Sequence, residues 1–132
     1  MTDAGPRGVL ALRTMAMPAD TNPAGDVFGG WLMAQMDLAA GMIGVKRSGG
    51  RVATVAVDGM SFHRPVRVGD AVGCYGDVVR VGRTSLEILV ETWVERDEAT
   101  TAVKVTEARF TMVALSADGR PRRLPGPDLQ PA

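Results

Sequence analysis

A single carboxylate interrupts a long apolar stretch of the sequence. The segment from Leu32 to Val45, LMAQMDLAAGMIGV, contains one charged residue, Asp37. An isolated carboxylate is costly to bury unless a partner or a proton neutralises it. A partly desolvated carboxylate is also a stronger base near neutral pH, and it can take a proton from water or attack an electrophile itself. Two interpretations stay open: Asp37 is catalytic, or it is structural and bonds to a loop amide.

Two glycines and an asparagine precede this carboxylate. Gly29 and Gly30 stand where a helix is expected to begin, and the free amides and positive dipole end of a helix stabilise developing negative charge. Glycine lets such amides approach a substrate oxygen closely, although plain helix-entry geometry explains the two residues as well. The Asn22 amide could hold water or a carbonyl group, and a local Asx turn is an equally good explanation.

The element that positions Asp37 is predicted to be a helix from Gly29 or Gly30 to about Val45. Good helix formers fill this stretch, and the sequence KRSGG that follows supplies the basic last turn and the glycines at which helices end. The helix is apolar on all sides, so protein must enclose most of its circumference.

Strands are predicted around this helix. After a first strand at 9–15 and a loop at 18–26, alternating or β-branched runs favour strands at 52–62, 71–81, 85–95 and 102–115. Bulges are expected at Gly59 and near Thr106, and a hairpin turn is expected at ERDEAT, residues 95–100. Strands joined by short turns form an antiparallel sheet. Either that sheet curls around the helix, or a partner chain covers the remainder.

Length and composition indicate one domain. We expect residues 1–8 to be disordered, residues 9–118 to form the domain, and the Pro/Arg-rich residues 119–132 to be a flexible tail. Fifteen basic and fifteen acidic residues balance, which gives no pull toward nucleic acid or an anionic membrane. The one cysteine, Cys74, excludes an intrachain disulfide and argues against a cysteine-based metal cluster, and no metal site is expected. The first residues are polar and lack the features of a signal peptide, so a cytoplasmic protein is expected.

The pattern N-x-x-G-x-x-F-G-G-x-x-x-x-x-x-D, from Asn22 to Asp37, closely resembles the YciA-like acyl-CoA thioesterases, as do TVAVDGMSFHRPVRVGD and VGRTSLEILVETWVE. The resemblance implies an α+β hotdog fold, in which a curved five-stranded antiparallel sheet wraps a long central helix and dimerises into a double hotdog. It also implies hydrolysis of fatty-acyl and short acyl-CoA thioesters without a cofactor, and a hexamer built as a trimer of dimers. Asn22 of one subunit would then face Asp37 of the other.

Coenzyme A carries several phosphates, so its binding site should gather basic residues. Arg64 with Pro65 in HRPV, and Arg83 with Thr84 and Ser85 in VGRTS, are the candidates, with each arginine equally explained as a solvated surface residue.

Two rival functions stay open for this fold. A hotdog dehydratase would pair a catalytic histidine with the helix acid, but His63 follows a strand and does not open the proline-rich motif of those enzymes. A non-catalytic acyl-CoA-binding module would keep the fold and would gain nothing from an unpaired carboxylate beside its ligand.

Overall fold

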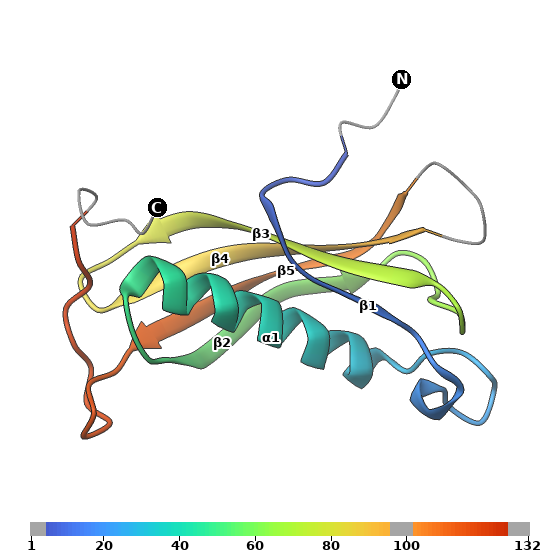
Figure 1. The fold of residues 1–132 in the computed structure, drawn as a ribbon, viewed down its shortest axis with the longest axis horizontal. Helices are drawn as coiled ribbons and strands as arrows, with labels where there is room; N and C mark the ends of the chain where they lie inside the picture. The colour runs from blue at the N-terminus through green and yellow to red at the C-terminus, as the bar shows by residue number, and fades with distance from the viewer. Residues whose placement is uncertain (1–4, 96–101, 127–132) are drawn as a thin grey trace.

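One long helix lies across a five-stranded antiparallel sheet in the computed structural model, which describes residues 5–95 and 102–126 (Figure 1). The sheet has the order β1-β3-β4-β5-β2. This arrangement confirms the predicted architecture. The elements are β1 (Val9–Met15), a 3-10 turn η1 (Pro18–Asp20), α1 (Gly29–Ser48), β2 (Val52–Phe62), β3 (Ala71–Val81), β4 (Ser85–Glu95) and β5 (Val103–Ala114).

The helix α1 begins at the predicted glycines and ends three residues later than expected. Lys46 and Arg47 occupy its last turn, where positive charge favours the carbonyl end of the helix dipole. Gly49 then closes the helix with φ of 78°, and its amide donates to the carbonyl of Val45 at 2.8 Å. A left-handed residue of this kind is readily supplied by glycine, which is why the helix stops there.

Both predicted bulges are present. The pairing of β2 with β5 shifts register between Asp58 and Ser61, around Gly59, whose φ is 68°. The pairing of β4 with β5 shifts between Thr92 and Trp93, opposite Thr106 and Lys104. The expected hairpin turn between these strands falls largely at residues 96–101, outside the described residues.

The main core lies between α1 and the sheet. Met36, Ala39 and Ala40 of the helix pack against the inner face of β4 and β5, on residues such as Ile88 and Phe110. The alternation predicted for this face of β4 is confirmed, since Leu86, Ile88, Val90 and Val94 are all buried. Cys74 is buried there too, and burial raises the pKa of its thiol to about 11 although a hydrogen bond with Thr92 opposes the shift.

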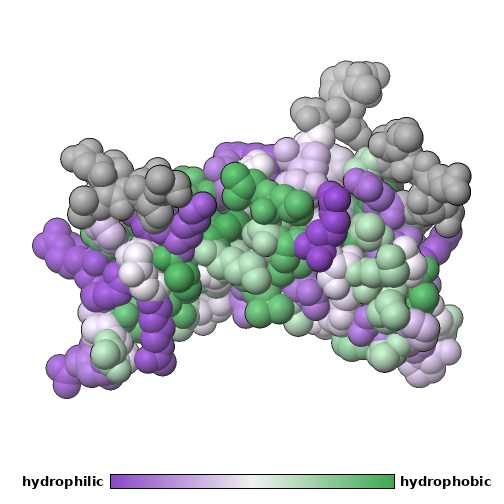
Figure 2. Space-filling model, viewed as in Figure 1, coloured by the Kyte–Doolittle hydropathy of each residue, from purple (hydrophilic) through white to green (hydrophobic). Residues whose placement is uncertain are grey.

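The sheet covers only one side of the helix. Leu38 and Met42 are 55% and 52% exposed, and Val55 on the edge strand β2 is 58% exposed. Figure 2 shows apolar surface gathered across the middle of this face. The helix was expected to be enclosed either by a curled sheet or by a partner chain. Within one chain, the sheet does not enclose it. Asp37 lies on the uncovered face and is itself exposed, so its own chain does not provide the partial desolvation expected for a base.

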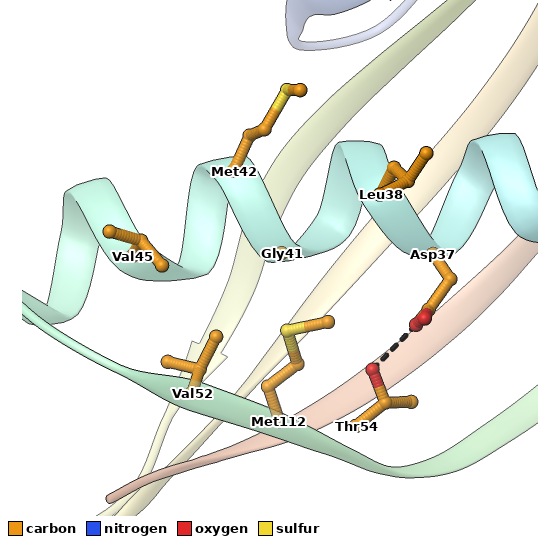
Figure 3. Close-up of a pocket in the computed structure, with 8 residues that line it drawn as sticks. All are labelled: Asp37, Leu38, Gly41, Met42, Val45, Val52, Thr54 and Met112. Carbon is orange, nitrogen blue, oxygen red and sulfur yellow. Dashed lines mark hydrogen bonds between the residues drawn. The ribbon is translucent and has the colours of Figure 1, made fainter. Parts of the chain in front are cut away.

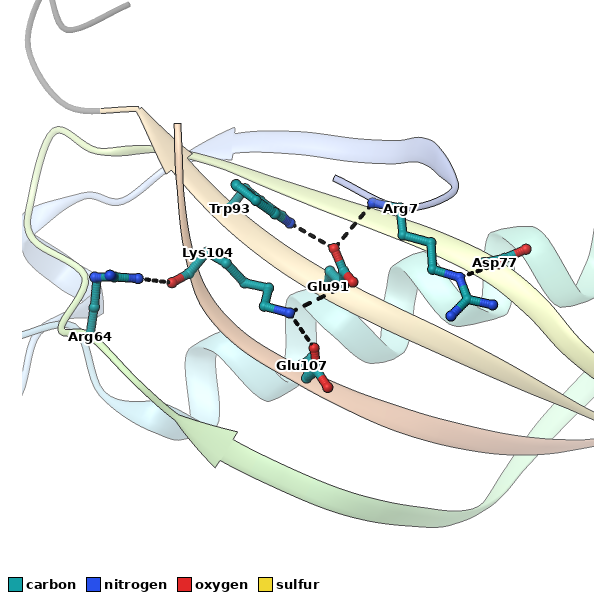
Figure 4. Close-up of polar contacts among 7 residues, drawn as sticks. All are labelled: Arg7, Arg64, Asp77, Glu91, Trp93, Lys104 and Glu107. Atoms are coloured by element: carbon teal, nitrogen blue, oxygen red, sulfur yellow. Dashed lines mark hydrogen bonds and ion pairs between the residues drawn. The ribbon is translucent and has the colours of Figure 1, made fainter. Parts of the chain in front are cut away.

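The outer face of the sheet is less open than the alternation of β4 predicts. Glu91 lies on this outer face, yet it is only 7% exposed and accepts hydrogen bonds from the Trp93 indole at 2.9 Å and from the Arg7 amide at 3.1 Å (Figure 4). The Lys104 ammonium lies 3.8 Å from the same carboxylate. Arg7 also pairs with Asp77 at 2.6 Å. The expected disorder of residues 1–8 is thus wrong for Arg7, because two charged partners hold it; residues 1–4 are outside the described range.

The start of the C-terminal tail is also held in place. Arg122 donates to the carbonyls of Leu115 at 2.9 Å and Ser48 at 3.0 Å, and the Arg47 guanidinium donates to the carbonyl of Pro125 at 3.2 Å. Residues 119–126 therefore belong to the domain, contrary to the expected boundary at 118. Within the described ranges, no helix combines the length and apolarity that a membrane span requires.

Candidate active site

A groove of about 650 Å³ runs between α1 and the strands β2 and β5 (Figure 3). It carries one acidic side chain, Asp37, at one end. Apolar residues form most of the rest. The lining residues are Asp37, Leu38, Gly41, Met42, Val45, Val52, Thr54 and Met112. An apolar groove with one reactive polar end is typical of a site for an elongated apolar substrate.

Asp37 is oriented by a neighbour on β2. The Thr54 hydroxyl donates to Oδ1 of Asp37 at 2.5 Å, so it holds one carboxylate oxygen (Figure 3). Among the described residues no group donates to Oδ2, which leaves that oxygen for water or substrate. Sequence reasoning missed Thr54, because only the packing of β2 beside α1 brings it to the carboxylate. Thr54 is two residues after Val52, so the two side chains lie on the same face of the strand, and this spacing was the available signal.

Asn22 holds its own loop together. Its Oδ1 accepts hydrogen bonds from the amides of Ala24 at 2.9 Å and Asp26 at 3.1 Å, so the Asx-turn interpretation is confirmed. Asn22 is exposed, and these two bonds use only Oδ1, so its NH₂ group can still donate to a ligand. Because Asn22 precedes the helix and Asp37 lies eight residues into it, about 12 Å along its axis, one chain does not bring the two together.

Gly29 and Gly30 open α1 beside a second hollow of about 340 Å³. Phe28 provides no side-chain cap, so the first amides of the helix are left for another acceptor. A Cβ on Gly29 would lie 3.3 Å from the Phe62 ring, and one on Gly30 would lie 3.4 Å from Phe28. Close packing therefore adds a structural reason for these glycines. His63, Arg64 and Pro65 line the same hollow.

The candidate CoA-binding residues fall at opposite ends of the sheet. Arg64 follows β2, and its guanidinium donates to the carbonyl of Lys104 at 2.7 Å (Figure 4). Arg83 lies in the turn after β3, where its carbonyl accepts from Leu124 at 2.9 Å. A strand rises about 3.4 Å per residue, so the 11 residues of β3 hold the two arginines roughly 30 Å apart. They can meet one ligand only if different copies of the chain supply them.

The turn at Thr84 and Ser85 is occupied by the protein itself. The Thr84 carbonyl accepts from Ala114 at 2.8 Å, and the Ser85 carbonyl accepts from Gly82 at 2.7 Å. The Gly82 amide of this turn is thus already bonded within the chain. Among the described residues, no three His, Cys, Asp or Glu side chains are grouped closely enough to hold a metal ion.

Comparison with known proteins places this geometry in a family. A family model described as the thioesterase superfamily matches residues 24–101. The acyl-CoA thioester hydrolase YciA of Salmonella typhimurium is 51% identical over 126 residues, which cover 93% of this chain and 95% of the relative. The crystal structure of HI0827, a hexameric broad specificity acyl-coenzyme A thioesterase, is 46% identical with a TM-score of 0.89, covering 98% of this chain and 92% of that one.

A second similar structure is an acyl-CoA hydrolase from Staphylococcus aureus, in complex with butyryl coenzyme A and coenzyme A. It is 30% identical with a TM-score of 0.82, covering 87% of this chain and 70% of that one. Solved variants of that hydrolase include an Asn→Ala and an Asp→Ala mutant whose positions are 15 residues apart, the separation of Asn22 and Asp37. Sequence, fold and the matched pattern agree, and this chain belongs to the thioesterase superfamily, whose hotdog fold its helix and sheet form.

Proposed function

We propose that the protein hydrolyses acyl-CoA thioesters to a carboxylic acid and free CoA, with Asp37 as general base or nucleophile. The observation that carries this proposal is the lone carboxylate of Asp37 at one end of an apolar groove, oriented by Thr54. The names of the similar proteins, acyl-CoA thioester hydrolase and thioesterase, support the same reaction.

As a general base, Asp37 acts through Oδ2. That oxygen removes a proton from water, the water oxygen attacks the thioester carbonyl, and the tetrahedral intermediate collapses to expel the CoA sulfur, which takes up a proton. As a nucleophile, Asp37 forms an anhydride and expels the CoA sulfur, and water then cleaves the anhydride. In both routes the amides of Gly29 and Gly30 stabilise the oxyanion, and the Asn22 NH₂ group donates to the carbonyl or the water. No cofactor is needed.

The site requires two copies of the chain. The amides at the start of α1 lie about 12 Å along the helix from the Asp37 of the same chain. The exposed apolar side of α1 and the unpaired edge of β2 offer a surface that a second copy can cover. Such a dimer brings Asn22 and Gly29 of one copy to Asp37 of the other. The hexameric state of HI0827 supports a trimer of such dimers.

The CoA phosphates are assigned to arginines from more than one copy of the chain. Arg64 and Pro65 lie beside Gly29 in the hollow at the helix start, close to the proposed oxyanion site. Arg83, Thr84 and Ser85 then act from another copy, because the length of β3 separates them from Arg64. The cytoplasmic location stays a prediction.

The test of the proposal is release of free thiol from acyl-CoAs ranging from acetyl to palmitoyl. The wild-type protein should release thiol from acyl-CoAs of this series, and Asp37→Ala should lower kcat by about 10²–10⁴, the usual contribution of a positioned acid or base. Asp118→Ala, which removes an exposed acid in the turn after β5 and outside the groove, serves as the control and should leave kcat unchanged.

The same variant separates catalysis from binding and from stability. Asp37 and Thr54 are both exposed, so Asp37→Ala leaves no buried donor unpaired and should keep the wild-type melting temperature and the affinity for CoA. Tight CoA binding by a wild-type protein that releases no thiol would support the non-catalytic binding module instead. Retained turnover in Asp37→Ala would contradict the mechanism.

A further inference from the structure

The groove beside Asp37 has a defined length. Asp37 and Thr54 form its polar end, and Val45 and Val52 lie at the other end, facing each other across the gap between α1 and β2 (Figure 3). Asp37 and Val45 are separated by eight helical residues, which correspond to about 12 Å. The groove therefore runs along two turns of helix from the proposed reactive carboxylate to the apolar pair Val45 and Val52.

Gly41 lies halfway along this path. It is four residues after Asp37 and four before Val45, so all three lie on one face of α1. A Cβ added to Gly41 would meet no atom within 4 Å, which means that open groove lies over the residue. Gly44 differs, because its Cβ would lie 3.2 Å from the Met112 sulfur and 3.3 Å from Val52. Packing within the chain explains Gly44 and leaves Gly41 unexplained.

Glycine inside a helix is unfavourable relative to alanine, so Gly41 weakens α1 without relieving any contact in its own chain. Its effect is to leave the groove unobstructed one turn beyond Asp37. A larger residue there would fill the groove beside Met112 and separate the polar end from Val45.

We infer that Gly41 is a specificity-determining residue that lets a straight acyl chain pass along α1, and that Val45 and Val52 limit this chain to about ten carbons. The inference rests on the proposed thioester hydrolysis. An extended chain advances about 1.25 Å per carbon, given C–C bonds of about 1.5 Å and angles near 111°. The 12 Å between Asp37 and Val45 thus holds about ten carbons, and the 6 Å to Gly41 holds about five.

The deciding variant is Gly41→Leu, assayed by thiol release on acetyl-, butyryl-, octanoyl-, decanoyl- and palmitoyl-CoA. Butyryl-CoA ends before Gly41 and should keep its kcat/KM. Octanoyl- and decanoyl-CoA must pass the new side chain, so their kcat/KM relative to butyryl-CoA should fall at least about tenfold, as for misfits in apolar pockets. Ala117→Leu places a leucine in the exposed turn after β5, outside the groove, and should not change this ratio.

Two further variants test the same path independently. Gly41→Ala places a methyl group in open space and a better helix former in α1, so it should fold and give a smaller decrease of the octanoyl-to-butyryl ratio. Val45→Ala shortens a side chain of the apolar pair and should raise the kcat/KM for dodecanoyl-CoA relative to decanoyl-CoA.

The outcomes separate this inference from the function on which it rests. A wild-type protein that releases no thiol from any acyl-CoA contradicts the proposed function. Wild-type turnover with an unchanged length profile in Gly41→Leu and Gly41→Ala overturns the inference alone. It is also overturned if Gly41→Leu loses turnover equally at all lengths or dissociates the oligomer in light scattering, because Gly41 then serves contact between copies.

Discussion

Thr54 determines which oxygen of Asp37 faces the substrate. A carboxylate in water rotates freely, whereas a hydrogen bond of 2.5 Å to Oδ1 leaves Oδ2 as the reactive oxygen. The two side chains come from different elements, so the orientation of the base depends on the distance between α1 and β2. Thr54 thus positions the base and does not itself react.

Thr54→Val should lower kcat by about 10- to 100-fold, the usual effect of losing a hydrogen bond to a charged group. KM should change little, because valine keeps the methyl group of threonine and its shape, and only the hydroxyl is replaced. Thr54→Ser keeps the hydroxyl and should restore most of kcat. Equal losses in the serine and valine variants would show that Thr54 acts through packing.

The buried thiol of Cys74 should make the free energy of unfolding fall at high pH. Burial raises the pKa of this thiol to about 11 from an ordinary value of 9.0, so the folded chain holds this proton more tightly than the unfolded chain. The stability is full below pH 9 and falls as the pH rises toward 11, by roughly 2–3 kcal/mol for two pKa units. Chemical denaturation of wild type and Cys74→Ala between pH 8 and 11 should show this loss only in the wild type. Parallel curves would contradict it.

Residue types and spacing identified part of the site in advance. Asp37, Gly29 and Asn22 belong to one continuous sequence pattern, so they could be recognised as candidates from the sequence alone. Thr54 and the buried Glu91 were not predicted, because each depends on a partner in a distant part of the chain. Periodicity shows which face of a strand a residue occupies, and it does not show what else covers that face.

At the scale of elements, the end of α1 is held by the tail. Ser48, the last residue of the helix, receives two hydrogen bonds from Arg122: one to its carbonyl and one to its hydroxyl. The same guanidinium reaches the carbonyl of Leu115 just after β5, so a single side chain joins the helix end to the last strand.

Arg122→Ala should lower the free energy of unfolding by about 1–3 kcal/mol, because half-buried carbonyls lose their donor. The neighbouring Arg123 is exposed, and Arg123→Ala provides a matched loss of charge that should leave stability unchanged. Urea denaturation of the two variants measures the difference. Equal stability of both would mean that the tail contributes nothing to the domain.

The elements were largely predictable because alternation, glycines and helix formers are local signals. The bounds of β2, β3 and β4 agree with the prediction, and both bulges fall where a glycine or a change of phase indicated them. The tail and Arg7 were mispredicted, because their order depends on distant partners such as Ser48 and Glu91 and not on their own composition.

At the scale of the whole molecule, the exposed side of α1 and the edge of β2 point to assembly. Mixing separately inactive Asn22→Ala and Asp37→Ala chains tests the two-chain site. A mixed dimer keeps one intact site of two, so random exchange should restore about a quarter of wild-type activity. The measurement is thiol release after subunit exchange, with each variant alone as control. No recovery in mixtures shown to exchange would place both residues in one chain.

The strand order has a consequence for biosynthesis. β2 pairs only with β5 among the described strands, yet β3 and β4 are made between them, and β5 is the last strand to leave the ribosome. Until then β2 has no hydrogen-bonded neighbour, and Val55, Val57 and Phe62 sit on an open strand while the chain grows. Such long-range pairing is slow and leaves nascent chains prone to aggregate. A chain cut short within β4 loses the partner of β2 altogether, so truncation should yield insoluble protein and not a smaller folded domain.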